Sequence, residues 1–88
     1  MKYEVILKRK VERGLVKLPL RVQKKLAVLA NDLRDQGPLQ SIWPNYNKLS
    51  STEYHCHLER SWVACWRHEK QRSVIEVYDV GRREKAPY

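Results

Sequence analysis

The first residues alternate between apolar and polar positions, a pattern typical of a β-strand. In "KYEVILK", residues 2–8, the side chains of Tyr3, Val5 and Leu7 recur at every second position. Successive side chains of a strand point to opposite faces, so these three residues share one face. The β-branched residues Val5 and Ile6 favour the same conformation. We therefore predict a first strand here.

The hydrophobic spacing then changes to a helical one over residues 9–19. Gly14 lies in the middle of this segment, and glycine weakens a helix interior. We therefore predict only a short helix. The apolar positions at i, i+4 and i+7 that define it are Val11, Leu15 and Leu18.

A second, longer helix is predicted after Pro19. Proline is favoured in the first turn of a helix, and Gly37-Pro38 supplies a stop signal. Between these limits the apolar residues follow one another at spacings of four, three and four, and one alanine joins them. Such a stripe is typical of a helix packed on a core. Its members are Val22, Leu26, Leu29, Ala30 and Leu33.

The second half of the chain predicts a loop and three strands. Residues 38–53 are rich in Pro, Asn and Ser, which indicates a loop that Trp43 and Tyr46 hold over the core. The breaks around residues 60–61 and 70–72 are short enough for antiparallel hairpins. The strand-like runs are "EYHCHLE" (53–59), "WVACWRHE" (62–69) and "SVIEVYDV" (73–80), and a polar tail follows Gly81.

The predicted order is strand, helix, helix, loop and three strands, which is an α+β arrangement. Eighty-eight residues suit a single domain over 1–88. With both helices on one face of the sheet, the other face would be open for a ligand. No apolar run is long enough for a membrane span and no signal peptide is recognised, so we expect a cytoplasmic protein.

The net charge of the chain indicates which classes of molecule it could bind. The formal net charge is +8, which favours an anionic partner such as nucleic acid or an acidic protein. A basic surface without a specific partner is the alternative on charge alone. The two cysteines, Cys56 and Cys65, do not form a disulfide framework, and we expect both to stay reduced and packed.

The segment "YHCHLERSWVACWRHEK", residues 54–70, holds all three histidines and both cysteines. A metal site is one interpretation, because His55 and His57 have the i, i+2 spacing of a zinc pair on a strand. Strand alternation places Cys56 on the other face, and further ligands do not converge. Another interpretation is that the two histidines face solvent and have no functional role.

Acid–base chemistry on RNA fits the histidine pair better than metal binding. Histidine titrates near neutral pH and can act as base or acid. Attack of a 2′-hydroxyl on the adjacent phosphorus needs a base, an acid for the leaving oxygen and cations for the extra negative charge. No metal or cofactor is required. The candidate cations include Arg67, Arg82, Arg83 and Lys85.

The chain resembles the RelE/ParE superfamily of type II toxin–antitoxin toxins. The resemblance rests on the Tyr54-x-x-x-Leu58 strand, the hydrophobic strand after it, the "VGRRE" turn and a tyrosine a few residues later. The upstream strand, two helices and "NKL" loop agree in order. The resemblance implies a β-α-α-β-β-β fold, with a mainly antiparallel twisted sheet and two helices on one face.

The resemblance also implies site residues. It points to His55, His57, Arg83 and Tyr88 as catalytic, with Arg83 on the scissile phosphate and Tyr88 on the nucleotide. In RelE-type enzymes a third-strand arginine falls at the position of Val63, so this chain departs from the pattern there. Residues expected to bind RNA or phosphate are Arg67, Arg82, Lys85 and Lys48.

For function, the resemblance implies a toxin that is a metal-independent, ribosome-dependent endoribonuclease acting on mRNA. Its partners would be a cognate antitoxin, in a toxin–antitoxin hetero-oligomer, together with mRNA and the ribosome, and no membrane. Two alternatives stay open. One is a poison of DNA gyrase of the ParE type, and the other is a non-enzymatic module that binds protein or nucleic acid, since fold alone does not fix function.

Overall fold

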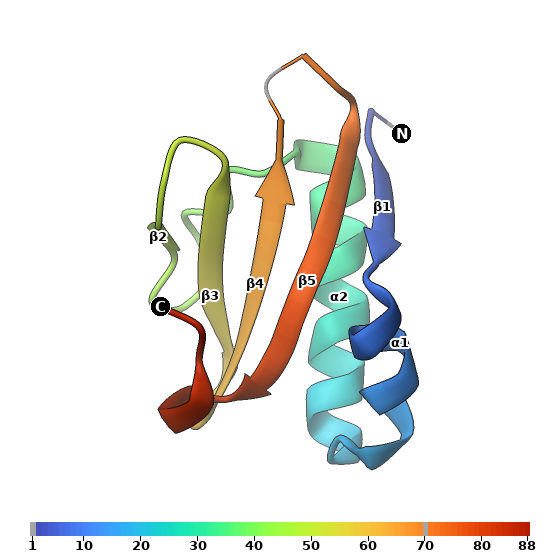
Figure 1. Cartoon of the computed structure of the whole chain (residues 1–88), viewed down its shortest axis with the longest axis vertical. Helices are drawn as coiled ribbons and strands as arrows, with labels where there is room; N and C mark the ends of the chain where they lie inside the picture. The colour runs from blue at the N-terminus through green and yellow to red at the C-terminus, as the bar shows by residue number, and fades with distance from the viewer. Residues whose placement is uncertain (1, 70) are drawn as a thin grey trace.

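The computed structural model describes residues 2–69 and 71–88, and it has the predicted α+β architecture (Figure 1). Lys70, in the predicted turn between the last two strands, lies outside the described residues. The strands are β1 (Glu4–Leu7), β2 (Asn47–Lys48), β3 (Glu53–Glu59), β4 (Trp62–His68) and β5 (Val74–Arg82), the α-helices are α1 (Arg9–Gly14) and α2 (Leu20–Gln36), and the short 3₁₀ helices are η1 (Leu15–Lys17) and η2 (Arg83–Lys85).

One sheet contains all five strands in the order β1-β5-β4-β3-β2. Its pairs are antiparallel except for β1 with β5, which run parallel in register from Glu4 opposite Val74 to Leu7 opposite Val77. The mainly antiparallel sheet is thus confirmed. The two-residue strand β2 was not predicted. It falls within the expected loop, where it pairs with β3 at the edge of the sheet (Figure 1).

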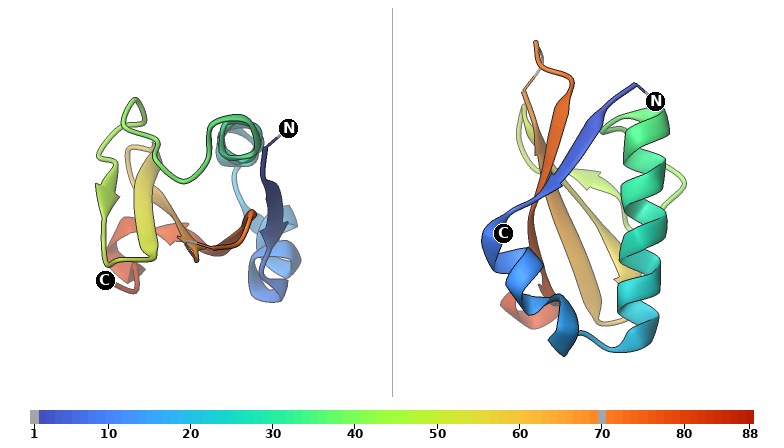
Figure 2. Two further views of the ribbon diagram at one scale, coloured as in Figure 1. Left: turned by 90° about the horizontal axis from the view of Figure 1, so that it is seen from above. Right: turned by 90° about the vertical axis from the view of Figure 1, so that its right-hand side faces the viewer.

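Helix α2 lies along one face of the sheet (Figure 2). Its predicted apolar stripe is buried in full, from Val22 at 0% exposed to Ala30 at 9%. Gly37 ends the helix with φ of +88°, a left-handed conformation that glycine adopts at little cost. Among the described residues, no helix combines the length and apolarity needed to cross a membrane.

The first helix is shorter than predicted. Helix α1 ends at Gly14, and a single 3₁₀ turn, η1, continues to Lys17. Leu18 is extended, with ψ of 144°, because the residue before a proline is disfavoured in the helical region. Pro19 therefore separates the two helices, although Leu15 and Leu18 still pack against the core as expected.

Three aromatic rings form the centre of the core beneath the loop. Trp66 is fully buried and stacks against Tyr54 and Tyr46, with ring centroids 6.1 and 6.2 Å away. Its indole Nε1 donates a hydrogen bond to the Pro38 carbonyl at 3.0 Å. The loop is therefore attached to the sheet, as the sequence predicted for Tyr46 and Trp43, and Trp43 itself is buried.

Candidate functional site

The histidine pair lies on the sheet face opposite α2. In β3, Tyr54, Cys56 and Leu58 belong to the core cluster under the helices, so the alternate residues point the other way, as predicted. His55 is paired with Cys65 and His57 with Val63 on β4. Directly opposed residues share a face, so these four side chains lie together. We call this surface the histidine face.

The histidine face is not open as predicted. His55 is only 7% exposed, and Val63 and Cys65 are fully buried. The physical reason is the segment after β5, which folds back across the sheet. The backbone N–H of Arg83 donates to the Ser61 carbonyl at 2.7 Å, and the Tyr88 ring stacks on His55 with centroids 4.3 Å apart.

His55 and His57 are close but have different environments. Their ring centroids are 6.5 Å apart. Burial, followed by the proximity of His57, lowers the pKa of His55 below its ordinary value of 6.5. Its Nδ1 is buried and has no hydrogen-bond partner among the described residues. His57 is half-buried, and Asn45 Nδ2 lies 3.4 Å from its ring nitrogens. The lowered pKa keeps His55 neutral at pH 7.

Tyr88 and Arg83 complete the group. Burial raises the pKa of Tyr88 above 10.0, while the positive charge of Arg83 opposes that rise and so acts on the phenol. The structure therefore brings Tyr88 onto the histidine pair of β3, and the charge of Arg83 acts on the Tyr88 phenol. At neutral pH the phenol of Tyr88 is protonated, so it can donate a hydrogen bond or stack.

Arg67 lies on the histidine face, where its guanidinium already contacts the side chains of Glu76 and Tyr78. Its Nη1 is 3.1 Å from Glu76 Oε1, and its guanidinium lies 4.5 Å from the centroid of the Tyr78 ring. The Tyr78 hydroxyl in turn donates to Glu53 Oε1 at 2.9 Å. Glu76 and Tyr78 therefore hold Arg67 on the sheet, and a phosphate would have to compete with the Glu76 carboxylate for it.

The other predicted phosphate ligands lie elsewhere. Arg82 is opposite Trp62, contacts the Trp62 ring and pairs with Glu84 at 3.1 Å, so it lies on the core side of the sheet. Lys48 is opposite Tyr54, with its Nζ 5.8 Å from that ring centroid, also away from the histidines. Lys85 is exposed in η2. The structure therefore does not bring Arg82 and Lys48 together with the histidines, and their role as RNA or phosphate ligands stays a prediction.

The described residues do not assemble a metal centre. Residues 2–69 and 71–88 contain no cluster of three or more His, Cys, Asp or Glu side chains placed to hold an ion. Cys56 is in the core cluster, as strand alternation predicted, and Cys65 is on the histidine face. Burial raises the pKa of each thiol to about 12. Both thiols are therefore protonated and suited to packing.

Asn45 is a site residue that the sequence reasoning missed. It has φ of +52°, and the preceding Pro44 carbonyl accepts a hydrogen bond from the His57 backbone N–H at 2.8 Å. This bond brings the Asn45 amide beside the imidazole of His57. The signal in the sequence was the Pro-Asn pair in "WPNY", which favours a turn with a left-handed residue.

The lowered pKa of His55 predicts a dependence of stability on pH. Its folded-state pKa lies below the unfolded value near 6.5, so folding favours the neutral ring. That contribution is present above about pH 6.5 and is lost as the pH falls through the folded-state pKa. We expect the free energy of unfolding, measured with urea, to decrease from pH 7.5 to pH 5, and to decrease less in His55→Gln.

His68→Gln is the control for this measurement. The His68 Nε2 lies 2.6 Å from the Arg72 carbonyl oxygen at the far end of β4. Its replacement should leave the additional acid sensitivity in place. Equal decreases in His55→Gln and the unmutated chain would contradict the assignment to His55.

Comparison with known proteins identifies the fold. No protein-family model matches the sequence, and no curated protein does. Among solved structures, the chain is similar to one from the archaeal RelE–RelB complex of Pyrococcus horikoshii OT3, with a TM-score of 0.78 and 16% identity over 98% of this chain and 100% of that chain. The isolated E. coli RelE toxin gives a TM-score of 0.74 at 18% identity, over 97% of this chain and 88% of that one. A chain of the RelBE2 toxin–antitoxin complex from Mycobacterium tuberculosis gives a TM-score of 0.70 at 20% identity, over 94% of this chain and 100% of that one. The chain has the RelE fold.

Proposed function

We propose that this chain, which has the RelE fold, is the toxin of a type II toxin–antitoxin system and a metal-independent endoribonuclease. The observation that carries the proposal is the stacking of Tyr88 on His55 beside His57, with the charge of Arg83 acting on the Tyr88 phenol. The net charge of +8 supports a polyanionic substrate. The structural similarity to RelE toxins supports the same assignment.

The two histidines would divide the acid–base work. His55, kept neutral by burial, takes the proton of the 2′-hydroxyl as the O2′–P bond forms. His57, with its ring 6.5 Å away, protonates the O5′ as the P–O5′ bond breaks. The products are a 2′,3′-cyclic phosphate and a 5′-hydroxyl. Asn45 would orient the His57 ring.

Arg83 would hold the scissile phosphate, and Tyr88 would contact the nucleotide. The raised pKa of Tyr88 favours a protonated phenol, and therefore stacking or hydrogen-bond donation rather than base catalysis. Because its ring covers His55, the substrate must move Tyr88 aside or occupy a position next to it. Arg67 would serve as a second cation only after releasing Glu76.

Val63 stands where RelE-type enzymes carry an arginine, so the proposed stabilisation of the phosphate depends more strongly on Arg83. Val63 is fully buried and supplies no charge where RelE-type enzymes carry an arginine. The positive charge available for the transition state would therefore come mainly from Arg83. We further propose the cytoplasm as its location, with mRNA on the ribosome as substrate and a cognate antitoxin as partner.

Mapping mRNA 5′ ends after induction of the protein tests the proposed function. We expect new 5′-hydroxyl ends within coding regions and an early stop of protein synthesis. Breaks in chromosomal DNA with intact mRNA would instead support the gyrase poison and overturn the nuclease. Growth without either effect would overturn the toxin assignment itself.

A further inference from the structure

Gly81 leaves an open position on the histidine face near the end of β5. It is paired with Val63 of β4, and Val63 is paired with His57 of β3, so the three residues form one row across the sheet. Glycine weakens a strand, because it has no side chain to pack and more backbone freedom to lose on folding. Its presence in this row therefore calls for a physical reason.

The folded chain itself supplies no reason for a glycine at this position. Gly37 is the glycine with a positive φ, so the backbone conformation of Gly81 suits other residues as well. The register of β4 with β5 shifts between Cys65 and Trp66, away from Gly81, so no bulge requires it. A methyl group at Gly81 would meet no heavy atom of residues 2–69 and 71–88 within 4 Å, its chain neighbours aside. We call this open position the Gly81 gap.

A glycine in a strand that serves neither a bulge nor a tight contact within the protein marks a place where another molecule comes close to the backbone. The row that contains the Gly81 gap indicates which molecule. Neighbouring strands are about 4.8 Å apart, so Gly81 lies roughly 10 Å across the sheet from His57. A substrate held at His57 therefore extends over the Gly81 gap.

Arg83 lies on one side of the Gly81 gap. Its backbone N–H donates to the Ser61 carbonyl at 2.7 Å, so the pairing with β4 continues to this residue. Residues two apart in an extended chain share a face and lie roughly 7 Å from each other. Arg83 is exposed and forms no ion pair with any other residue that the structure describes. Its positive charge is therefore available beside the gap.

Lys10 lies on the other side of the gap. Asp79 precedes Gly81 by two residues and is paired with Cys65, so it is also on the histidine face. Its Oδ1 lies 2.9 Å from the Nζ of Lys10 in α1. The pair is neutral as a whole, but the Asp79 side chain is 16% exposed and that of Lys10 is 60% exposed. Asp79 thus holds an accessible ammonium group at this edge of the histidine face.

We propose that the Gly81 gap receives the sugar–phosphate backbone of the RNA next to the scissile phosphate, which rests on the proposed nuclease function. The missing side chain lets the RNA lie directly on β5, while Arg83 and Lys10 bind phosphate oxygens on either side. Two accessible cations that flank an uncharged gap suit a polyanion with charges at regular intervals. Gly81 is thus a residue that contacts the substrate and takes no part in proton transfer.

Addition of a side chain at Gly81 tests this inference. Gly81→Ala and Gly81→Val fill space that is empty in the free protein, so the midpoint of urea unfolding should be unchanged or higher. The rate of appearance of new mRNA 5′ ends after induction should nevertheless fall, by about tenfold or more for alanine and further for valine, because a displacement of about 1 Å can cost about 10²-fold in rate. A purely structural role would change stability and rate in the same direction.

Gly14→Ala is the matched control. A methyl group at Gly14 would likewise meet no heavy atom of the described chain within 4 Å, and Gly14 is the last residue of α1 rather than part of the sheet. The variant should therefore retain its stability and cleave at the unmutated rate.

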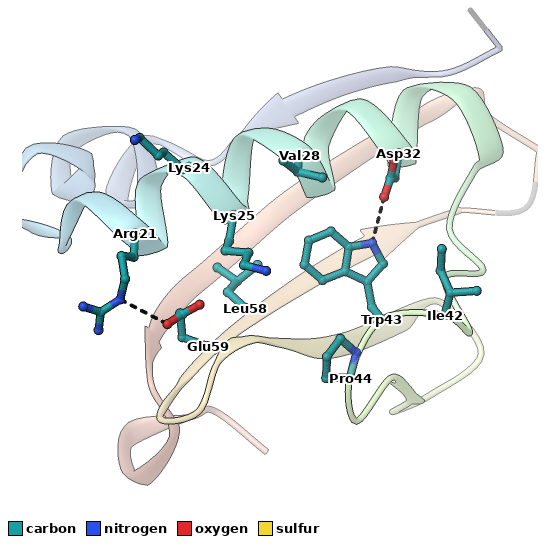
Figure 3. Close-up of a pocket in the computed structure, with 10 residues that line it drawn as sticks. All are labelled: Arg21, Lys24, Lys25, Val28, Asp32, Ile42, Trp43, Pro44, Leu58 and Glu59. Atoms are coloured by element: carbon teal, nitrogen blue, oxygen red, sulfur yellow. Dashed lines mark hydrogen bonds and ion pairs between the residues drawn. The ribbon is translucent and has the colours of Figure 1, made fainter.

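Lys10→Gln tests the second cation. An exposed phosphate contact of this kind is expected to contribute about two- to fivefold to the cleavage rate. The control is Lys24→Gln with Lys25→Gln, because these two lysines line a groove on the other side of the sheet, between α2 and the loop before β2 (Figure 3). It removes more charge than Lys10→Gln and should leave the rate unchanged. Equal losses in the two variants would show an effect of total charge and exclude the assigned contact.

The outcomes separate this inference from the proposed function. If the unmutated chain cleaves mRNA and both Gly81 variants cleave as fast, the Gly81 gap holds no RNA and the nuclease stands. If the unmutated chain does not cleave mRNA, the proposed function fails and the substrate contact fails with it. Slower cleavage together with a lower urea midpoint would assign Gly81 to folding alone. Unaltered cleavage with weaker binding of a fluorescent polyglutamate peptide would make an acidic peptide the occupant of the gap.

Discussion

Replacing His57 with alanine is expected to reduce mRNA cleavage by a factor of about 10²–10⁴, which is the usual contribution of a positioned acid or base. His55→Ala should cause a loss of similar size, and the double variant should lose little more than the larger single one, because both histidines serve one step. The measurement is the rate of appearance of new mRNA 5′ ends after induction. Unaltered cleavage by the double variant would reject the proposed roles.

His68→Ala is the matched control, since this third histidine lies at the far end of β4, bonded to Arg72. It should cleave at the unmutated rate. His55 is buried, so circular dichroism must establish that its variant is folded. His57 is half-buried, and its replacement tests the chemistry with less effect on packing.

Trp66→Ala is expected to lower the free energy of unfolding by about 3–5 kcal/mol, the cost of removing a buried large aromatic side chain. The indole is fully buried, stacks on Tyr54 and Tyr46, and donates to the Pro38 carbonyl. The free energy of unfolding of a small domain is roughly 5–15 kcal/mol in total. The variant should therefore be marginally folded, as measured by urea unfolding.

Two further variants separate packing from hydrogen bonding. Trp66→Phe keeps an aromatic ring but leaves the Pro38 carbonyl without its donor, which should cost about 1–3 kcal/mol. Trp62→Ala removes a partly buried tryptophan at the start of β4 and should cost less than Trp66→Ala. A smaller loss in Trp66→Ala than in Trp62→Ala would contradict the central position of Trp66.

The local pattern of the sequence predicted the longer helix and the longer strands, but not β2. The strand at residues 53–59 and the buried stripe of α2 follow from periods of 2 and 3.6 residues, and the structure has both as predicted. The extended backbone of Leu18 could have been predicted, because Pro19 restricts the conformation of the residue before it. The parallel pairing of β1 with β5 could not, since alternation identifies a strand but not its neighbour.

The site was predictable only where strand alternation decided it. Alternation placed His55 and His57 on one face, as observed. The burial of His55 depends on a ring contact with Tyr88, 33 residues later, which local periodicity does not encode. Placing Arg82 away from the histidines required the strand register, which pairs Arg82 with Trp62. Proximity in sequence to Arg83 was a misleading guide, because Arg82 is the last residue of β5 and the chain leaves the strand at Arg83, the first residue of η2.

The pairing of β1 with β5 has a consequence for how the protein comes into being. Glu4 meets Val74 across 70 residues of chain, so the edge of the sheet cannot close while β5 is still being synthesised. The segment that brings Arg83 and Tyr88 to the histidines follows β5. A nascent chain would therefore have no assembled site while it is being translated. Under the proposed function, the ribosome that makes the chain would meet no assembled site until the segment after β5 had emerged and the sheet had closed, a slow step for contacts of such long range.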